Sequence, residues 1–405
     1  MNILVLSELI HPHGSGAELA TFLYADMLSK MGCNVAVVTN RFVGEPNSAK
    51  IGSLEIYRLP LLGEAIDTKY SILRRSDVLL TDFMRRMIRW SDIVYVPRFW
   101  FSAILAAKAY SKPVVTHLHD YIPVCPLATL HDKSKTRQCD CGRFQCSAKC
   151  IYDFEKAHGR GTGEMIASLA LNLSLGRVLP RMVGLSDAVI CVSRAQRDLI
   201  VRKEPSFREK IHVVYNPIVT QTAVDVEGKG FGYFGGRDCL KGFYLLCKAL
   251  ADRQATYSEQ IAVHATKFQD IEPNVSELLS KLGFLLYGKL DGAKFKAVYR
   301  QIQTVLVPSL WNEPWPYVVV EALTQRRLLI ASKIGGIPEQ VEGCKGVFLC
   351  EPGDKKQLAD TIEMVKGLND DQVSDFGLQS REVFLRRFNN ESSVRKFIRI
   401  CEQLA

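Results

Sequence analysis

Short apolar runs alternate with longer amphipathic stretches along most of the chain. In the first half, apolar runs at 3–7 and 35–39 flank a loop rich in Gly and His and an amphipathic stretch at 17–31. Further runs follow at 93–96, 114–118 and 188–193, and the last leads into a helical stretch at 194–202. This order predicts βαβ units with parallel strands that are buried on both faces. We therefore expect a doubly wound α/β domain in the first half.

A polar segment at 220–230 interrupts this pattern and is interpreted as a linker. After it, new apolar runs separated by helical stretches occupy 231–234, 261–264, 284–287, 304–308 and 328–332. They predict a second α/β domain of the same class. The expected organisation is a first domain at 1–217 with an insert at about 125–150, a second domain at 218–384, and a charged C-terminal helix at 385–405 that could cross back to the first domain.

Length and composition agree with two folded domains. The chain has 405 residues, 47% apolar and 23% charged, which excludes disordered, collagen-like and low-complexity proteins. A formal net charge of +9 favours anionic partners such as nucleotides, phosphorylated lipids, membrane surfaces or nucleic acid, and does not choose among them. The N-terminus lacks the features of a signal peptide, and no apolar run reaches the roughly 18 residues of a membrane span. We expect a cytoplasmic protein, or one peripheral to the cytoplasmic face of a membrane.

The loop at 13–18 lies between a predicted strand and a predicted helix. Gly14 and Gly16 let the backbone approach a ligand, and the first amides of the helix can hold an anion. A tight turn without a ligand is the alternative. Leu19 stands where a dinucleotide fingerprint has its third glycine, which argues against an NAD-dependent oxidoreductase.

Two later loops carry charged residues. In the loop at 235–242, Arg237 and Lys241 can together neutralise a diphosphate, with two solvated cations in a turn as the alternative. In the segment at 308–323, Glu313 would lie in the loop before a helix that begins near 316 or 317, and Glu321 in its second turn. The two carboxylates could then accept hydrogen bonds from hydroxyl groups of one ligand; a favourable interaction with the helix dipole is the alternative.

These motifs together resemble retaining glycosyltransferase family 4, whose members have the GT-B fold. The resemblance rests on the E-x7-E pattern of Glu313 and Glu321, on Arg237 with Lys241, and on four further segments, 16–18, 116–120, 308–309 and 335–339. It covers essentially the whole chain. It implies two facing Rossmann-like doubly wound domains with a cleft between them, the acceptor bound by the first and the nucleotide-sugar by the second.

The resemblance also implies roles for individual residues. Arg237 and Lys241 would bind the diphosphate and stabilise the leaving nucleotide, and Glu321 would hold the ribose. Glu313 would contact hydroxyls of the donor sugar, and Gly16 would bring its backbone near the phosphate. The family retains anomeric configuration without a securely established protein nucleophile, so neither a covalent nucleophile nor a catalytic metal is assigned.

His119 is the residue of the first domain that we expect to reach the donor sugar or the reacting centre. It shares its strand with His117, and we expect the two side chains to point to opposite faces, so that only one can serve the site. His119 is chosen because it precedes Asp120 at the end of the strand and matches the family position. A hydrogen-bonded core histidine is the alternative.

The sequence departs from the family pattern in three places. Pro316 replaces a glycine and has no amide to donate, so contacts to phosphate or sugar would come from Tyr317 or Val318. The spacing from Arg237 to Lys241 is one residue shorter than in many relatives. Where relatives often have a glycine before the next strand, this chain has two arginines, at 326–327.

A cysteine cluster lies in the expected insert. Cys139, Cys141, Cys146 and Cys150 could close a structural zinc site, with Cys125 as a substitute ligand. Buried or disulfide-linked cysteines are the alternative, and an iron–sulfur cluster is a third interpretation. We expect the insert to shape the acceptor side without taking part in the chemistry.

A basic amphipathic stretch at 70–89 carries five arginines, Arg74, Arg75, Arg85, Arg86 and Arg89. Such a helix can lie on an anionic membrane, and lipid-linked acceptors are common in the family; a solvated helix face is the alternative.

The expected function is that of a retaining hexosyltransferase that moves a sugar from a UDP- or GDP-sugar to a hydroxyl of a glycan or a lipid-linked intermediate. A sugar-nucleotide epimerase, a phosphorylase and a basic binding module are alternatives. The first lacks identifiable acid and base carboxylates, the second needs a longer chain, and the third lacks a nucleic-acid motif, so nucleic acid is not an expected partner.

Overall fold

The computed structural model describes residues 1–61, 76–132, 137–139, 146–157, 159, 161–219, 222–257, 259–269, 271–290 and 292–405. The chain forms two compact units. Unit 1 comprises Met1–Leu130, Asp140–Pro217 and Asn389–Ala405, and unit 2 comprises His131–Cys139 and Ile218–Phe388.

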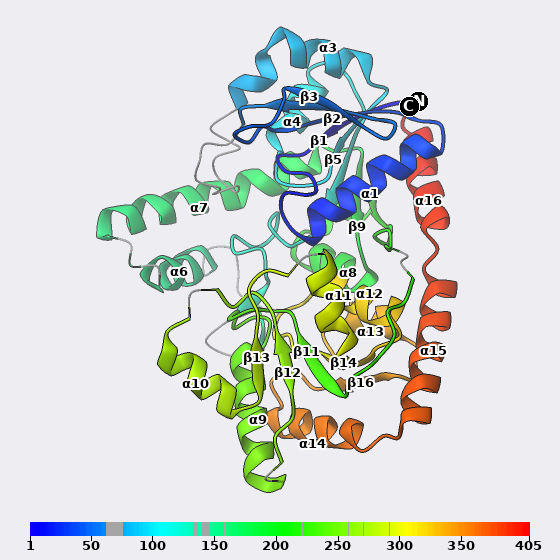
Figure 1. Cartoon of the computed structure of the whole chain (residues 1–405). Helices are drawn as coiled ribbons and strands as arrows, with labels where there is room; N and C mark the ends of the chain where they lie inside the picture. Colours follow the sequence, from blue (N-terminus) through cyan, green and yellow to red (C-terminus); the bar gives the residue numbers. More distant parts are fainter. Residues whose placement is uncertain are drawn as a thin grey trace. The chain divides into compact units, whose positions relative to one another are not determined.

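Unit 1 is built on an eight-stranded sheet in the order β10-β9-β6-β5-β1-β2-β4-β3 (Figure 1). The strands are β1 (Asn2–Leu6), β2 (Asn34–Asn40), β3 (Ser48–Ile51), β4 (Leu54–Leu59), β5 (Ile93–Val96), β6 (Val114–Leu118), β9 (Ala188–Cys191) and β10 (Ile211–Val213). All neighbours are parallel except β3 and β4. The central strands are buried along most of their length, as the continuous apolar runs predict.

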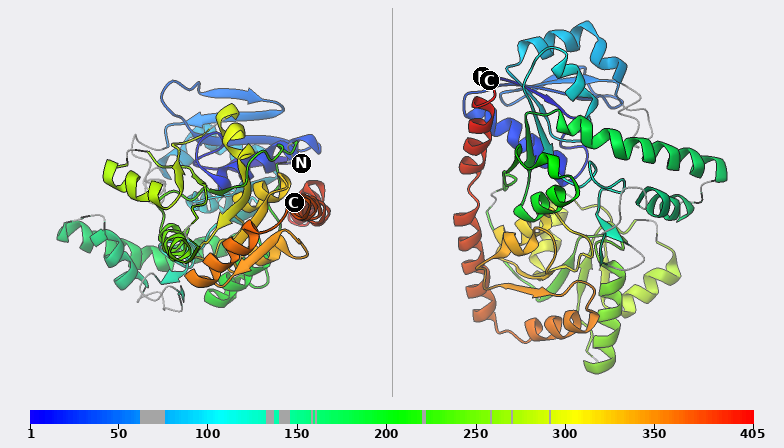
Figure 2. Two further views of the ribbon diagram at one scale, coloured as in Figure 1. Left: turned by 60° about the horizontal axis from the view of Figure 1, so that its bottom comes forward. Right: turned by 180° about the vertical axis from the view of Figure 1, so that it is seen from behind.

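The helices of unit 1 are α1 (Gly16–Lys30), α3 (Asp82–Trp90), α4 (Ser102–Lys108), α6 (Tyr152–Ala157), α7 (Thr162–Gly184), α8 (Arg194–Lys203) and α16 (Asn390–Glu402). The long helix α7 has α6 beside it (Figure 2). None of the helices in the described ranges is both long enough and apolar enough to cross a membrane.

The charged C-terminal stretch forms two helices, α15 (Asp370–Arg387) and α16, with a break at Asn389. The break occurs because the Asn389 side chain caps α16 by accepting a hydrogen bond from the Ser392 amide at 3.1 Å. Helix α16 packs in the core of unit 1, where Phe397 meets the Tyr95 ring edge-on at 4.9 Å.

Unit 2 has a six-stranded parallel sheet in the order β13-β12-β11-β14-β15-β16. The strands are β11 (Gly230–Tyr233), β12 (Val263–Ala265), β13 (Phe284–Leu286), β14 (Ile302–Val307), β15 (Leu328–Ser332) and β16 (Val347–Cys350). The helices are α9 (Phe243–Tyr257), α10 (Pro273–Lys281), α11 (Gly292–Arg300), α12 (Tyr317–Thr324), α13 (Ile337–Val341), α14 (Lys355–Lys366) and α15. Strands β7 (His131–Asp132) and β8 (Arg137–Gln138) pair with each other in an antiparallel two-stranded sheet.

The order of the strands decides which loops of unit 2 meet. Strands β12, β11 and β14 are neighbours, so the loops that follow them lie at one edge of the sheet. Parallel sheets bind ligands at this carboxyl edge. The predicted loop at 235–242 follows β11, and the segment that begins at 308 follows β14.

Candidate functional site

The centre of the site in unit 2 is an ion pair between Lys241 and Glu313. The Lys241 ammonium donates to Oε1 of Glu313 at 2.6 Å, and the Ser309 hydroxyl donates to the same oxygen at 2.9 Å. The Lys241 ammonium also lies 5.1 Å from the centre of the Trp311 ring. Glu313 is almost fully buried, whereas about a third of Lys241 is exposed (37%), so the pair presents its cation to solvent. Two residues expected at one ligand are therefore in direct contact.

Close backbone packing holds the two loops of this pair together. The Leu310 amide donates to the Leu240 carbonyl at 2.8 Å. Gly242 has φ +81°, and a Cβ atom there would lie 1.9 Å from the Pro308 carbonyl oxygen. Only glycine fits such a position, because it lacks a side chain and tolerates positive φ. The residue that follows Lys241 thus fixes its distance from the Glu313 loop.

Two adjacent glycines, Gly335 and Gly336, contact the Glu313 backbone. Gly335 has φ +58°, and its Cβ position lies 2.4 Å from the Glu313 carbonyl oxygen. The Gly336 amide donates to that oxygen at 2.7 Å. The glycines of the 335–339 motif therefore hold the Glu313 backbone in place.

Helix α12 begins at Tyr317, with Pro316 as its N-cap residue, as the sequence predicted. The amides of Tyr317 and Val318 lie in its first turn, where N–H groups point out of the helix end and can bind an anion. Glu321 lies in the second turn. The spacing of eight residues thus places one carboxylate before the helix and one on it.

Glu321 has an unusual electrostatic environment. Desolvation by the surrounding protein raises the pKa of Glu321 to about 7, and the charge of Lys267 partly opposes this rise. Water still reaches the side chain, which limits the effect of this desolvation on stability. Lys267 follows β12 at the same carboxyl edge as the Lys241 loop, and its backbone adopts φ +67°. Sequence reasoning missed Lys267, which stands two residues after β12 and belongs to none of the motifs identified in the sequence.

Arg237 stands apart from the ion pair. Its nearest charged partner is Glu272, with 3.7 Å between Nη1 and Oε2, and 44% of the side chain is exposed. The structure therefore brings Lys241 and Glu313 together and leaves Arg237 on the surface of unit 2, from where its long side chain can reach an incoming anion.

The two arginines before β15 have different roles. Arg326 is exposed and has φ +57°. Glycine adopts this backbone conformation most easily, which explains why relatives often have a glycine before this strand. Arg327 is fully buried and donates to the carbonyl oxygens of Gln325 at 2.6 Å, Val224 at 2.9 Å and Tyr299 at 3.0 Å. Arg327 thereby ties the segment after residue 222 to the sheet of unit 2.

In unit 1, the expectation for the two histidines is wrong. The rings of His117 and His119 stack with centroids 4.4 Å apart, so they lie on the same side. The physical reason is that side chains two positions apart share a face of a strand, and only adjacent ones alternate. His117 shares a 2.8 Å hydrogen bond with the Tyr95 hydroxyl, and burial lowers the pKa of His117 to about 3. His117 is the core histidine, and His119 lies beyond the strand end.

His119 is neutral at pH 7. Burial, together with the charges of His117 and Arg98, lowers the pKa of His119 well below its ordinary value. Its Nε2 atom is buried and has no hydrogen-bond partner among the described residues. A neutral ring of this kind can donate or accept a hydrogen bond at Nε2, according to its tautomer.

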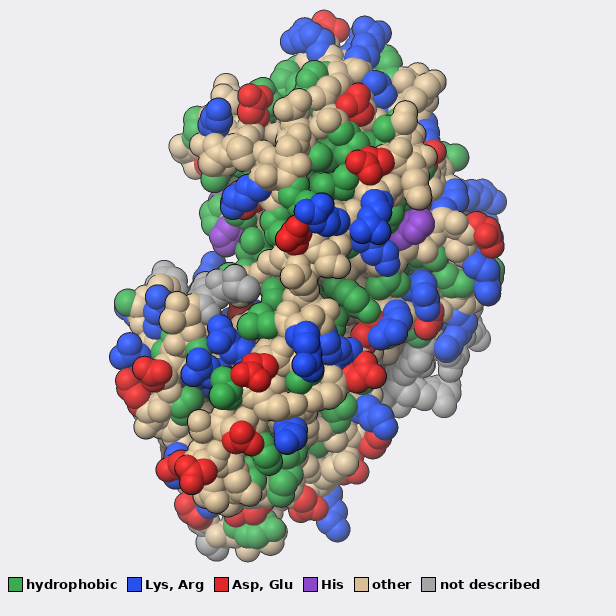
Figure 3. Space-filling view, turned by 90° about the vertical axis from the view of Figure 1, so that its right-hand side faces the viewer, with side chains coloured by type: hydrophobic (Ala, Val, Ile, Leu, Met, Phe, Trp, Pro, Cys, Tyr) green, Lys and Arg blue, Asp and Glu red, His purple; other side chains and the backbone are tan. Residues whose placement is uncertain are grey.

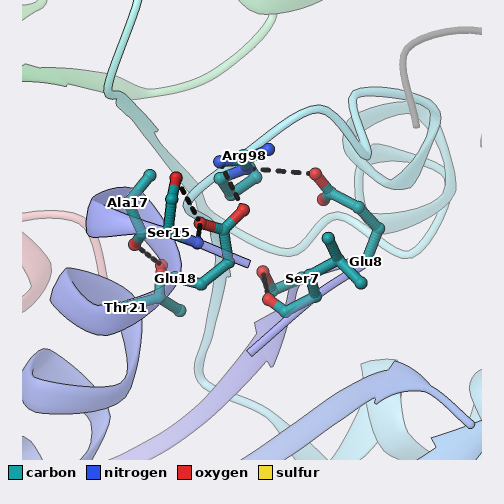
Figure 4. A network of polar contacts seen from close by, with 8 residues as sticks. Ser7, Glu8, Ser15, Ala17, Glu18, Thr21 and Arg98 are labelled. Atoms are coloured by element: carbon teal, nitrogen blue, oxygen red, sulfur yellow. Dashed lines mark hydrogen bonds and ion pairs between the residues drawn. The ribbon is translucent and has the colours of Figure 1, made fainter. Parts of the chain in front are cut away.

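A charge cluster that sequence reasoning missed lies around the loop at 13–18 (Figure 4). Arg98 pairs with Glu8 at 3.1 Å and with Glu18 at 2.5 Å. Glu18 also accepts the Ser15 amide at 2.6 Å, which fixes the start of α1. Gly16 is the first residue of α1, and Gly14 is the constrained glycine, since its Cβ position lies 2.3 Å from the Glu18 side chain.

The structure leaves the cysteine cluster largely untested. Cys141 and the side chain of Cys146 lie outside the described residues, while Cys125 and Cys139 are buried and Cys150 is half-buried. Among the described residues, no group of three or more His, Cys, Asp or Glu side chains is placed to hold a metal ion. The zinc site stays a prediction, which metal analysis of the purified protein tests.

The basic stretch at 70–89 is described only from residue 76, so Arg74 and Arg75 lie outside the described residues. The part described is the 3-10 turn Ser76–Leu80 and the short helix α3, whose Met84 and Ile88 are buried in the protein. Its exposed face carries Arg85, Arg86 and Arg89. On the face seen in Figure 3, Lys and Arg side chains are interspersed with Asp and Glu, so the net charge does not gather there into one patch.

Two family models match the chain, one in each half. The family model described as Glycosyltransferase Family 4 matches residues 14–222, and the model described as Glycosyl transferases group 1 matches residues 229–366. A Klebsiella pneumoniae protein described as an uncharacterized 42.6 kDa protein in the cps region is 22% identical over 357 residues, which is 87% of this chain and 90% of the relative.

Two solved structures share the fold across the chain. Sucrose-phosphate synthase from Thermosynechococcus elongatus has a TM-score of 0.72 at 14% identity, with 100% of this chain and 98% of that chain covered. Anabaena Alr3699/HepE in complex with UDP and glucose has a TM-score of 0.64 at 18% identity, with 99% of each chain covered.

Proposed function

This chain belongs to Glycosyltransferase Family 4, and on that premise we propose that it transfers a sugar, with retention of anomeric configuration, from a nucleotide diphosphate sugar to a hydroxyl of a glycan or a lipid-linked acceptor. It is a glycosyltransferase with the GT-B fold. To the glycosyltransferase activity of the family, the proposal adds the class of donor, the stereochemical outcome of the transfer and the class of acceptor.

The observation that carries the proposal is the contact between Lys241 and Glu313. A partly exposed ammonium next to a buried carboxylate suits a ligand that has both a phosphate, which the ammonium binds, and a hydroxyl, which donates a hydrogen bond to the carboxylate. Lys241 would stabilise the negative charge that develops on the leaving diphosphate, assisted by Arg237. Glu313 would accept a hydrogen bond from the donor sugar, and the amides of Tyr317 and Val318 would bind sugar or phosphate. Glu321 would hold the ribose.

In the proposed step, the acceptor oxygen forms a bond to the anomeric carbon while the bond from that carbon to the diphosphate oxygen breaks. The acceptor approaches from the face that the phosphate leaves, so its proton can pass to the departing phosphate oxygen. His119 would contact the sugar near this carbon from unit 1. Gly16 would bring the backbone at the start of α1 near the phosphate.

A UDP-sugar is the first donor to test, because the similar Anabaena protein was solved with UDP and glucose; GDP-sugars form the second arm. The purified protein is incubated with a panel of nucleotide-sugars and acceptors, and released UDP or GDP is measured. We expect release with one donor class, and loss of release in Lys241→Ala and Glu313→Ala. Lys333→Ala removes a cation from an exposed pair of unit 2 and serves as the matched control.

The same assay separates the alternatives. A sugar-nucleotide epimerase would change the sugar without releasing the nucleotide, and a binding module would leave the donor intact. If Lys241→Ala and Glu313→Ala both keep full transfer, the assigned site is wrong.

A peripheral contact with an anionic membrane is part of the proposal for lipid-linked acceptors. It is supported by the exposed arginines of α3, which offer electrostatic attraction without an apolar face, since Met84 and Ile88 point into the protein. Flotation with anionic liposomes at low salt tests it, and the absence of binding there would remove this part.

A further inference from the structure

Three neighbouring strands of unit 1 bring charged residues to one edge of the sheet. Glu8 follows β1, Arg98 follows β5 and Asp120 follows β6, and these strands are adjacent in the order β6-β5-β1. Glu18 joins them from the first turn of α1. Figure 4 shows the Glu8 and Glu18 side chains converging on Arg98.

The charge of Arg98 is fully matched by carboxylates. Its Nε donates to Glu8 and its Nη1 pairs with Glu18, while only 12% of its side chain is exposed. Burial lowers the pKa of Arg98, but the charges of Glu8, Glu18 and Asp120 outweigh that effect and raise it. Whether or not Glu8 is ionised, this edge of the sheet has no surplus positive charge.

Two buried polar atoms at this edge have no hydrogen-bond partner among the described residues: Oε2 of Glu8 and Nε2 of His119. The Glu8 side chain is fully buried. Buried polar groups in proteins are normally satisfied, so such atoms point to a ligand or a water that completes the site. A hydroxyl group can both donate and accept, which suits a carboxyl oxygen, an imidazole nitrogen and the remaining N–H groups of Arg98 together.

We propose that the Glu8–Arg98–Glu18 cluster recognises an uncharged, hydroxyl-bearing part of the acceptor and rejects acceptors that carry a phosphate or carboxylate there. The inference rests on the proposed function and adds the chemical class of the acceptor. Arg98 would contact acceptor hydroxyls, and Glu8 and Glu18 are positioning residues that hold the guanidinium and cancel its charge. An anionic acceptor would meet carboxylates without an available cation, and like charges at close range are strongly unfavourable.

The first experiment compares matched acceptor pairs: glucose with glucose 6-phosphate, and fructose with fructose 6-phosphate. With a donor that releases UDP, the wild type is expected to prefer the neutral member by at least about tenfold. Glu18→Gln removes a negative charge and should reduce this preference by about tenfold or more. Asp26→Asn removes a carboxylate from an exposed ion pair of α1 and should leave the preference unchanged.

The second experiment does not depend on finding the acceptor. Inorganic phosphate is titrated calorimetrically into the full chain after unit 2 has been saturated with UDP. The wild type should show no further phosphate site, whereas Glu18→Gln should create one that the additional change Arg98→Gln removes. Thermal melts without ligand show whether each variant is folded, and the wild-type preference within the matched acceptor pairs tests the inference without any variant.

Two results would overturn the inference. One is a wild-type preference for the phosphorylated member of a pair, and the other is a phosphate site in the wild type that Arg98→Gln abolishes. Failure of the proposed function looks different, because UDP would then neither bind nor be released, whatever the state of the cluster in unit 1.

Discussion

Lys241 and Glu313 are separated by 72 positions in the sequence, yet their charged groups lie 2.6 Å apart at the edge of the unit 2 sheet. Only 5% of the Glu313 side chain is exposed, whereas the Lys241 side chain is partly exposed. A phosphate that reaches Lys241 therefore competes with a carboxylate that is already in place. The pair holds the cation ready at a fixed position, which reduces the reorganisation needed when charge develops on a leaving group.

Lys241→Ala should affect both activity and stability. Transfer should fall by about 10²-fold or more, as for other removals of a charge-stabilising group. The free energy of unfolding should fall by about 1–2 kcal/mol, because Glu313 is left buried beside Ser309 alone. The double variant Lys241→Ala/Glu313→Gln should recover part of the stability but none of the activity, as measured by urea unfolding and UDP release. Additive losses of stability would show that the pair is not coupled.

Gly242→Ala should separate the two loops of the site. The added methyl group would collide with the Pro308 carbonyl, so the Lys241 loop must move and transfer should fall at least about tenfold. Gly353→Ala is the control, since Gly353 has a similar φ of +87° and nothing within 4 Å of its Cβ position. It should cost only the backbone strain, about 1 kcal/mol in unfolding, with normal transfer kinetics. Equal transfer rates in the two variants would contradict a role for the close approach.

The raised pKa of Glu321 makes stability depend on pH in a defined direction. Folding disfavours the ionised carboxylate, so the contribution of Glu321 to stability is fully present below about pH 4.5, the ordinary range, and is lost as the pH rises through about 7. Glu321→Gln does not ionise and should gain stability relative to the wild type between pH 5 and pH 8. Urea unfolding of both proteins at these two pH values measures this; a constant difference would show that the pKa is ordinary.

Neighbouring arginines should respond differently to the same change. Arg327→Met leaves the carbonyl groups of Val224, Gln325 and Tyr299 without their donor, and it should lower the free energy of unfolding by about 3 kcal/mol. Arg326→Met alters an exposed side chain and should stay within about 0.5 kcal/mol. Chemical denaturation of the two variants gives the comparison, and similar losses would mean that burial of Arg327 is unimportant.

The sequence predicted the parts of the fold that depend on continuous apolar runs. Strands such as β1, β5 and β6 lie where those runs occur, because strands buried on both faces are composed mainly of apolar residues. The strand β3 was missed because most of its residues are exposed, and β4 because only Leu54 and Ile56 are buried, which gives no continuous apolar run. The start of α12 at Tyr317 agrees with the predicted start near 316 or 317.

The site was predictable as separate loops but not as contacts. Lys241 and Glu313 were each identified by the motif that contains them, whereas their pairing depends on β11 lying next to β14, which strand order decides. Glu8 and Arg98 carry no motif and come together only because β1 and β5 are neighbours. Their one local signal is a charged residue shortly after a buried strand, which many solvated loops share.

The two ends of the chain both belong to unit 1, and the views in Figures 1 and 2 place them side by side. The larger part of unit 2, Ile218–Phe388, is therefore an insertion between two segments of unit 1, and His131–Cys139 is a second, shorter insertion. A truncation at residue 388 would remove Phe397 and its neighbours from the core of unit 1, so the first unit cannot be obtained as a simple N-terminal fragment. Joining the two ends by a short linker and opening the chain elsewhere should instead yield a circularly permuted enzyme, and exchanging the segment Ile218–Phe388 for that of a relative requires two junctions.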